Sequence, residues 1–262
     1  MLARKIKEKL KRGEVSCGGW MSIGNETIAE IFALSGYDWV LVETEHTAID
    51  NSETLRMLMA IEGRGCVSMV RLAGIDPIQA KALLDSGAGG VLVPMVNSKE
   101  DAEKCVGMTK YPPLGERGVG LARAHNYGKN FSEYVATAND DLLLMLQIEH
   151  IDAVNNIEEI VSVPGIDGTY IGPYDLSMSM GLPGQIDHPD VLAAMDKVLK
   201  ATLDKGLVPG IHLLHTDTAA GKIAEYTEKG YLFYALGSDL VILSECTEKL
   251  VKGCEQALIR NR

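Results

Sequence analysis

Short apolar runs recur along the chain, and most are followed by a segment with the spacing of an amphipathic helix. The runs are rich in Val, Leu and Ile and end at Gly, Pro or polar residues, as the buried strands of a parallel sheet do. We expect eight strands, at residues 15–22, 37–43, 66–72, 89–96, 142–149, 166–172, 207–214 and 231–237.

Helix start and stop signals separate these runs. Proline follows Asp76 and His188 at two expected helix starts, and glycine ends the same helices at positions 87 and 206. Strand–helix alternation predicts a parallel sheet covered by helices, and the even spread of strands favours a closed (β/α)₈, or TIM, barrel over an open doubly wound sheet. Further helices are expected at residues 26–36, 52–63 and 98–108.

Length and composition agree with one domain over residues 1–262. No Pro-, Gly- or Ser-rich tract divides the chain, and 262 residues suit one barrel. A net charge of −11 argues against a nucleic-acid partner, and no apolar run is long enough to cross a membrane. The N-terminal segment lacks the apolar stretch of a secretory signal, and five scattered cysteines form no C-x-x-C pair. We therefore expect a cytoplasmic protein with reduced thiols.

Acidic residues follow two of the expected strands. Glu149 ends the fifth strand and Asp175 follows the sixth, and in a parallel barrel both lie at the C-terminal mouth. Two carboxylates in a partly desolvated cup repel each other unless a cation neutralises them, and a small set of oxygen ligands suits Mg²⁺ or Mn²⁺. Ordinary salt bridges at the barrel rim are the alternative interpretation.

Basic residues reach the same mouth. Arg71 ends the third strand, where it either pairs with a neighbouring glutamate or offers its planar fork to a substrate carboxylate or enolate oxygen. His46 follows the second strand beside Glu45. It is either a base for proton transfer or merely a solvated side chain. Asp85 ends the helix after the third strand and either orients His46 or lies exposed.

Three other features have weaker assignments. The segment 111–134 has no strong periodicity and is expected to form a lid or a substrate wall. His212 and His215 are three apart at a strand end, so we assign them no metal. Residues 235–239 lie at the end of the last strand. They either bind a phosphate or, more simply, form a turn and a helix N-cap.

Five stretches of the chain carry a family resemblance. They resemble the HpcH/HpaI family of class II pyruvate aldolases, which includes enzymes of the 4-hydroxy-2-oxo-heptanedioate and 2-keto-3-deoxy sugar-acid types. The likeness spans nearly the whole chain. The stretches are GYDWVLVETEH, VRLAGIDPIQAKALLDSGAGGVLVPMV, YPPLGERGVGLARA, LQIEHIDAVNNIEEIVSVPGIDGTYIGPYDLSMSMG and FYALGSD.

The resemblance implies a role for each candidate. Glu149 and Asp175 fall on the family's metal-ligand positions, for Mg²⁺ or Mn²⁺ with Co²⁺ or Zn²⁺ as alternatives. Arg71 falls on the arginine that contacts pyruvate and steadies its enolate. His46 and Asp85 fall on a catalytic histidine–aspartate pair that moves protons.

Further site residues follow from the same resemblance. Gln147 falls on a polar residue beside the metal, and the turn Gly172-Pro173-Tyr174-Asp175 would present backbone amides to the pyruvate carboxylate. Two positions depart from the family pattern. Glu43 stands where aspartate is usual, and Tyr174 stands where small residues are common, which would narrow the aldehyde side.

The implied activity is the reversible cleavage of a 4-hydroxy-2-oxo acid to pyruvate and an aldehyde through a metal-stabilised enolate, that is, a divalent-metal-dependent aldehyde-lyase. A Schiff-base mechanism needs a lysine inside the barrel, and no expected strand contains one. The expected partners are a small 2-oxo acid, an aldehyde and copies of the same chain. The resemblance implies a trimer or hexamer whose apolar C-terminal helix covers a neighbouring barrel.

Two alternatives remain at this stage. A CoA-thioester lyase of the citrate-lyase β type would use the same barrel, but it needs a basic patch that the sequence shows only near its N-terminus. A non-catalytic binding barrel is disfavoured because Glu149, Asp175, Arg71 and His46 are all present, whereas a retired site would be expected to lose a charged group.

Overall fold

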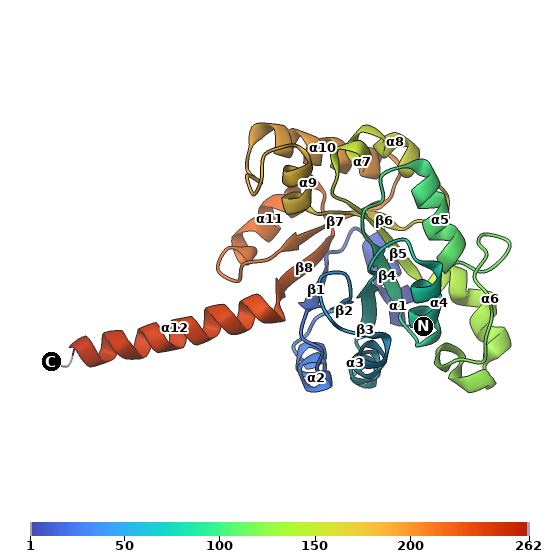
Figure 1. The fold of residues 1–262 in the computed structure, drawn as a ribbon, viewed down its shortest axis with the longest axis horizontal. Helices are drawn as coiled ribbons and strands as arrows, with labels where there is room; N and C mark the ends of the chain where they lie inside the picture. The colour runs from blue at the N-terminus through green and yellow to red at the C-terminus, as the bar shows by residue number, and fades with distance from the viewer. Residues whose placement is uncertain (1, 261–262) are drawn as a thin grey trace.

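Eight parallel strands pair in chain order and close into a barrel, with β1 hydrogen-bonded to β8 (Figure 1). The computed structural model describes residues 2–260. The closed barrel confirms the expected fold, and each strand overlaps an expected run, with β8 ending one residue beyond the expected 231–237. The strands are β1 Ser16–Met21, β2 Trp39–Glu43, β3 Val67–Arg71, β4 Gly90–Val93, β5 Leu143–Ile148, β6 Gly168–Ile171, β7 Val208–Leu213 and β8 Phe233–Ser238.

Helices surround this barrel, and those expected from the sequence are present. Pro77 and Pro189 lie in the first turns of α4 and α10, because proline costs no hydrogen bond there. The helices are α1 Leu2–Lys11, α2 Glu26–Leu34, α3 Asn51–Gly63, α4 Pro77–Asp85, α5 Lys99–Thr109, η1 Arg123–Gly128, α6 Phe131–Asp141, α7 Ile151–Asn155, α8 Ile157–Ile160, α9 Pro173–Ser179, α10 Pro189–Asp204, α11 Ala219–Lys229 and α12 Asp239–Arg260.

The base of the barrel, at the N-terminal ends of the strands, is filled with large apolar side chains. Trp39 stacks on Phe233 with 4.3 Å between the ring centroids. A Cβ atom at position 18 would lie 2.1 Å from the indole of Trp39, so glycine is needed there. Ile6 and Leu10 of α1 belong to the same buried cluster. Helix α1 therefore closes the base.

The alternation of side chains along each strand decides which residues point into the barrel at its mouth. Leu41 and Met69 belong to the inner cluster, whereas Val42 and Val70 belong to the layer between strands and helices. Since side chains alternate along a strand, Glu43 and Arg71 share the inner face with Leu41 and Met69. The mouth therefore receives polar side chains from strands whose lower halves are apolar.

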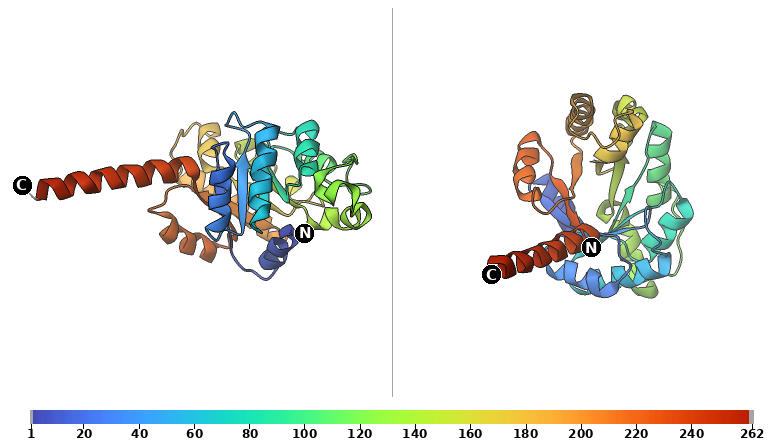
Figure 2. Two further views of the ribbon diagram at one scale, coloured as in Figure 1. Left: turned by 90° about the horizontal axis from the view of Figure 1, so that it is seen from below. Right: turned by 60° about the vertical axis from the view of Figure 1, so that its left-hand side comes forward.

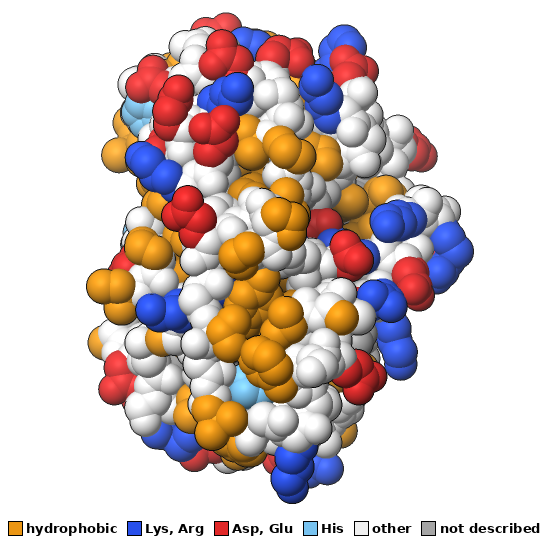
Figure 3. All heavy atoms as spheres, turned by 90° about the vertical axis from the view of Figure 1, so that its right-hand side faces the viewer, with side chains coloured by type: hydrophobic (Ala, Val, Ile, Leu, Met, Phe, Trp, Pro, Cys, Tyr) orange, Lys and Arg blue, Asp and Glu red, His pale blue; other side chains and the backbone are white. Residues whose placement is uncertain are grey.

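Apolar side chains also lie on the outer surface. Helix α12 leaves the barrel directly after β8 and extends well beyond it (Figures 1 and 2). Its exposed residues include Leu243, Leu250 and Leu258. Figure 3 shows a band of hydrophobic side chains on another face, and Ile78 and Leu121 are strongly exposed.

No helix among residues 2–260 is long and apolar enough to cross a membrane. All five cysteines are free, as expected, with Cys246 and Cys254 exposed on α12.

Candidate active site

A cavity of about 230 Å³ opens at the C-terminal mouth of the barrel. It brings Arg71 and Gln147 together with the turn that leads into α9. Side chains from β1, β3, β5, β6, β7 and β8 or from the loops after them line it, as in other barrels of this type. The lining residues are Trp20, Ser22, Arg71, Gln147, Tyr170, Ile171, Gly172, Pro173, Tyr174, Asp175, His212, Leu214 and Ser238.

Arg71 is buried and held by two glutamates. Its Nε donates to Glu43 at 2.6 Å, and its Nη1 lies 3.0 Å from a carboxylate oxygen of Glu45. Strand register explains the first pair, because Glu43 lies directly opposite Arg71 in the β2–β3 ladder. The expected pairing with a neighbouring glutamate is confirmed. The guanidinium also lies 3.5 Å from Gln147 Oε1 and 4.9 Å from the ring centroid of Trp20.

Glu43 also fixes the loop that carries Glu45 and His46. Its Oε1 accepts hydrogen bonds from the backbone of Glu45 at 2.6 Å and of His46 at 3.2 Å. Glu43 therefore has one carboxylate oxygen on the loop and the other on Arg71. His46 itself is 66% exposed at its side chain, with Nε2 3.7 Å from Glu45.

Glu149 is the most perturbed acid of the site. It is 3% exposed, and it accepts hydrogen bonds from the backbone N–H of Met95, at 2.9 Å, and from the Gln147 amide. Burial, together with the negative charges of Glu45 and Asp175, raises the pKa of Glu149 to about 7. Glu149 thus retains its proton more readily than an ordinary carboxyl.

The backbone of Met95 is strained at this contact. Its φ is 54°, which is unusual for a residue other than glycine. Such strain persists where the surroundings hold it, and here the N–H of Met95 donates to Glu149. The sequence signalled neither this contact nor Trp20, a large aromatic residue at the end of β1.

Asp175 lies in the first turn of α9, exposed at the cavity wall. The turn before it packs tightly on Glu149, since a Cβ atom at Gly172 would lie 2.8 Å from Glu149 Oε2. The N–H of Gly172 already donates to Ile148 at 3.2 Å, and proline has no N–H. Of the four residues expected to offer amides to a carboxylate, only Tyr174 and Asp175 retain an N–H for that purpose.

The expected pair of His46 and Asp85 does not form within one chain. Asp85 accepts from Arg117 at 2.7 Å, and the guanidinium of Arg117 lies 4.6 Å from the ring centroid of Tyr111. No hydrogen bond or ion pair joins His46 to Asp85 in the described part of the chain. Asp85 thus belongs to the packing of the 111–134 segment rather than to the mouth.

The acidic residues of the mouth fit a divalent cation. Glu149 and Asp175 offer hard carboxylate oxygens. The negative charges of Glu45 and Asp175 disfavour ionisation of Glu149, and a bound cation would offset this repulsion. No group of three or more His, Cys, Asp or Glu residues able to hold a metal occurs among residues 2–260. Two carboxylates would therefore leave most coordination positions to water and substrate.

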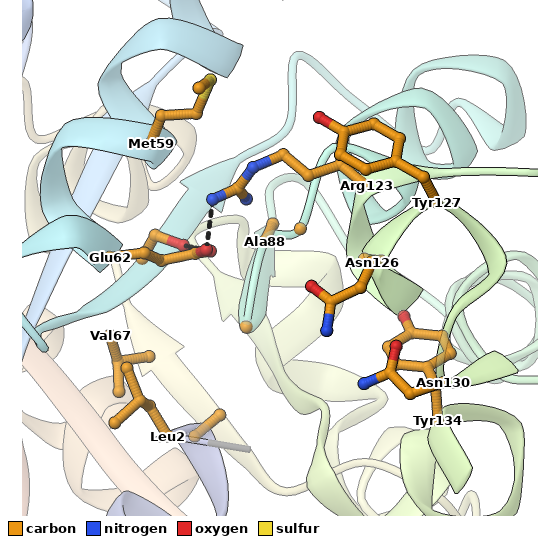
Figure 4. A pocket seen from close by; sticks show the side chains of 15 residues that line it. Leu2, Met59, Glu62, Val67, Ala88, Arg123, Asn126, Tyr127, Asn130 and Tyr134 are labelled. Atoms are coloured by element: carbon orange, nitrogen blue, oxygen red, sulfur yellow. Dashed lines mark hydrogen bonds and ion pairs between the residues drawn. The ribbon is translucent and has the colours of Figure 1, made fainter.

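A larger cavity, of about 580 Å³, lies near the base between α1, α3 and η1 (Figure 4). Its charged groups are Glu62 and Arg123, which pair with each other at 2.7 Å. The remaining lining is neutral, with Asn126, Asn130 and Tyr134 among its members. Converging acidic groups are thus a feature of the mouth and not of this cavity.

A closed parallel barrel with ionisable side chains from several strands at its C-terminal mouth defines an enzyme of the (β/α)₈ class. The chain belongs to the HpcH/HpaI aldolase/citrate lyase family, whose profile matches residues 17–245. The family resemblance seen in the sequence is confirmed.

Curated and structural relatives agree with this assignment. The chain is 40% identical to a 4-hydroxy-2-oxo-heptane-1,7-dioate aldolase of Salmonella typhimurium over 94% of this chain and 92% of that protein. The same enzyme of Shigella sonnei is 38% identical, over 95% and 94%. An HpcH/HpaI aldolase structure from Desulfitobacterium hafniense superposes with a TM-score of 0.89 at 34% identity, covering 95% of this chain and 96% of that one.

Proposed function

We propose that the protein is a class II aldolase that reversibly cleaves a 4-hydroxy-2-oxo acid to pyruvate and an aldehyde. The observation that carries this proposal is the arrangement of Arg71, Gln147 and Glu149 at the inner mouth, with Asp175 on the wall of the cavity there. The curated relatives, named as aldolases of this type over nearly their whole length, support it.

The reaction breaks the bond between C3 and C4 of the substrate. The C4 hydroxyl loses its proton and becomes the aldehyde, and the electron pair of the broken bond makes the pyruvate enolate, which is then protonated at C3. Arg71 faces the pyruvate half and offsets the negative charge that develops on the 2-oxo oxygen. Glu43 and Glu45 fix its fork in place, so little reorganisation is needed.

A divalent cation held by Glu149 and Asp175 would supply Lewis-acid polarisation of the 2-oxo group. Gln147 and Met95 hold the two oxygens of Glu149 and thereby orient its carboxylate. A Schiff-base route needs a lysine as nucleophile. The eight described strands contain no lysine, and no described residue that lines the mouth cavity is a lysine. Among the residues that the structure describes in that lining, Arg71 is the one cation, and it is already paired with glutamates. The phosphates of a CoA thioester would therefore lack a partner there.

His46 is proposed to move protons at the aldol hydroxyl. It lies on the loop that Glu43 fixes, and its exposure leaves it open to solvent and substrate. Replacement by alanine is expected to lower kcat more than the affinity for pyruvate. A variant with changed KM and wild-type kcat would remove this role.

The assembly is proposed to be a homo-oligomer in which α12 packs on a neighbouring barrel. Exposed leucines along a helix that extends from its own barrel support this, since such a surface is unfavourable in water. Light scattering of the full chain and of a variant ending before residue 248 would test it, with a smaller assembly expected for the shortened chain.

Chelation tests the proposed reaction. Pyruvate release from a 4-hydroxy-2-oxo acid is followed by coupling to lactate dehydrogenase, and EDTA is expected to lower the rate by at least about 10³-fold. Mn²⁺, Co²⁺ or Mg²⁺ should restore it. Activity that survives thorough chelation would contradict the metal-dependent mechanism.

A variant pair locates the cation. Glu149→Gln should weaken Mn²⁺ binding in calorimetry by at least about tenfold, because one charged ligand is lost. Glu62→Gln is the matched control, since Glu62 lies in the cavity near the base. Equal Mn²⁺ affinity of the two variants would remove Glu149 from the metal site.

A further inference from the structure

His212 lies at the end of β7 on the wall of the mouth cavity. Its ring stacks on Trp20 with 4.8 Å between centroids and 22° between planes. The guanidinium of Arg71 lies 4.9 Å from the Trp20 centroid. The indole therefore contacts both Arg71 and the imidazole, and it separates His212 from the guanidinium that is proposed to face the pyruvate half.

The hydrogen bonding of His212 fixes which ring nitrogen is free. Nε2 lies 3.0 Å from the carbonyl oxygen of Gly237, and a carbonyl only accepts, so Nε2 carries the proton. Burial, together with the positive charge of Arg71, lowers the pKa of His212 to about 4. The imidazole is thus neutral near pH 7, and Nδ1 is an acceptor that has no hydrogen-bond partner among the described residues.

Polar side chains line the cavity around His212. Ser22, Tyr174 and Ser238 bring hydroxyl groups to the same cavity, whose only cation, among the described lining residues, is the paired Arg71. A narrow annex of about 60 Å³ continues past His212 and Tyr174, and it contains Lys222. The main cavity is therefore suited to hydroxyl groups rather than to a second carboxylate.

We propose that His212 is a specificity-determining residue that selects 2-hydroxyaldehydes, its Nδ1 accepting a hydrogen bond from the hydroxyl next to the aldehyde carbon. This inference rests on the proposed aldolase activity. In the synthetic direction C3 of the pyruvate enolate attacks the aldehyde carbon, the new carbon–carbon bond forms and the aldehyde oxygen takes a proton. The neighbouring hydroxyl is unchanged, so the product is a 4,5-dihydroxy-2-oxo acid.

The test compares 2-hydroxypropanal with propanal, which differ by one hydroxyl group. With Mn²⁺ and pyruvate, wild-type kcat/KM is expected to be about tenfold higher for the hydroxylated aldehyde, as one hydrogen bond of average strength provides. His212→Leu should abolish that preference. An absent preference in the wild type, or one that survives in His212→Leu, would overturn the proposal.

Two amide variants separate the ring nitrogens. His212→Asn places an amide oxygen near the position of Nδ1 and should retain the preference. His212→Gln places an amide nitrogen near the position of Nε2 and should lose the preference. His215→Leu is the matched control: His215 is exposed and pairs with Glu245, so the preference should persist. The reverse pattern for asparagine and glutamine would contradict the assigned acceptor.

Exchange of the pyruvate methyl protons in D₂O separates failure of this inference from failure of the proposed function. A wild-type protein that does not exchange them with Mn²⁺ present does not form the enolate, and the function itself falls. A protein that exchanges them without favouring the hydroxyl group overturns only the role of His212. A preference for 4-oxobutanoate that Lys222→Met removes would place selectivity at the annex and overturn that role too.

Discussion

The mouth and the base of the barrel are built on the same inward faces of the same strands. At the base these faces carry Trp39 and Phe233, stacked and sealed by α1. At the mouth, Glu43 and Arg71 continue the inner face. The base can be close-packed because its residues need no partners, whereas each mouth residue must be hydrogen-bonded or ion-paired once buried. The residues that stabilise the barrel thus lie at the N-terminal ends of the strands, and the polar residues of the candidate site lie at the C-terminal ends.

The two arginines of the cavities show the same difference. Arg71 is buried at the mouth between Glu43 and Glu45, and Arg123 is partly exposed near the base with Glu62 (Figure 4). Both are ion-paired, so pairing alone does not identify the functional arginine. The functional arginine is identified by its position beside Gln147 and on the same mouth as Glu149.

Substitution of Arg71 should reduce activity far more than substitution of Arg123. Arg71→Met should lower kcat/KM by about 10³-fold, because the developing negative charge loses its buried partner, whereas Arg123→Met should change it by less than about threefold. The coupled pyruvate assay measures both. Similar losses in the two variants would mean that the mouth is not where the charge develops.

The protonation of Glu149 gives the next effect. The folded chain raises its pKa from 4.5 to about 7, so the folded state binds this proton more tightly than the unfolded chain. The associated stability is complete below pH 4.5 and is lost as the pH rises through 7. Between pH 5 and 8 the metal-free protein should lose up to about 3 kcal/mol from this group.

Urea unfolding in EDTA at a series of pH values checks this expectation. Glu149→Gln cannot ionise, so its stability should lack that part of the pH dependence. Parallel curves for the variant and the wild type would show that Glu149 is not the responsible group.

The smallest effect concerns the base. Ile6→Ala removes buried methyl groups from the contact between α1 and the barrel and should lower the free energy of unfolding by about 2 kcal/mol. kcat/KM of the folded enzyme should stay within about twofold of the wild type, because distant sites act independently. A marked loss of activity in the fully folded variant would show that packing at the base affects catalysis at the mouth.

Much of the fold was predictable because it depends on local periodicity. The expected runs at residues 37–43, 66–72 and 142–149 contain β2, β3 and β5, since strand identity follows from apolar spacing and flanking turns. The identity of the residues at the mouth followed from the same rule, because functional side chains of a parallel barrel lie after its strands. The roles of Glu149, Asp175 and His46 stay predictions.

The eight strands, the polar residues at their ends and the family could all be inferred from the order of residues alone. The partners of those residues became known only from the folded chain: Arg71 pairs with both glutamates, Glu149 with the strained backbone of Met95, Asp85 with Arg117, and Trp20 with His212. Periodicity is a property of neighbours in the chain. An ion pair or a stack depends on register and loop conformation, which bring together groups far apart in sequence.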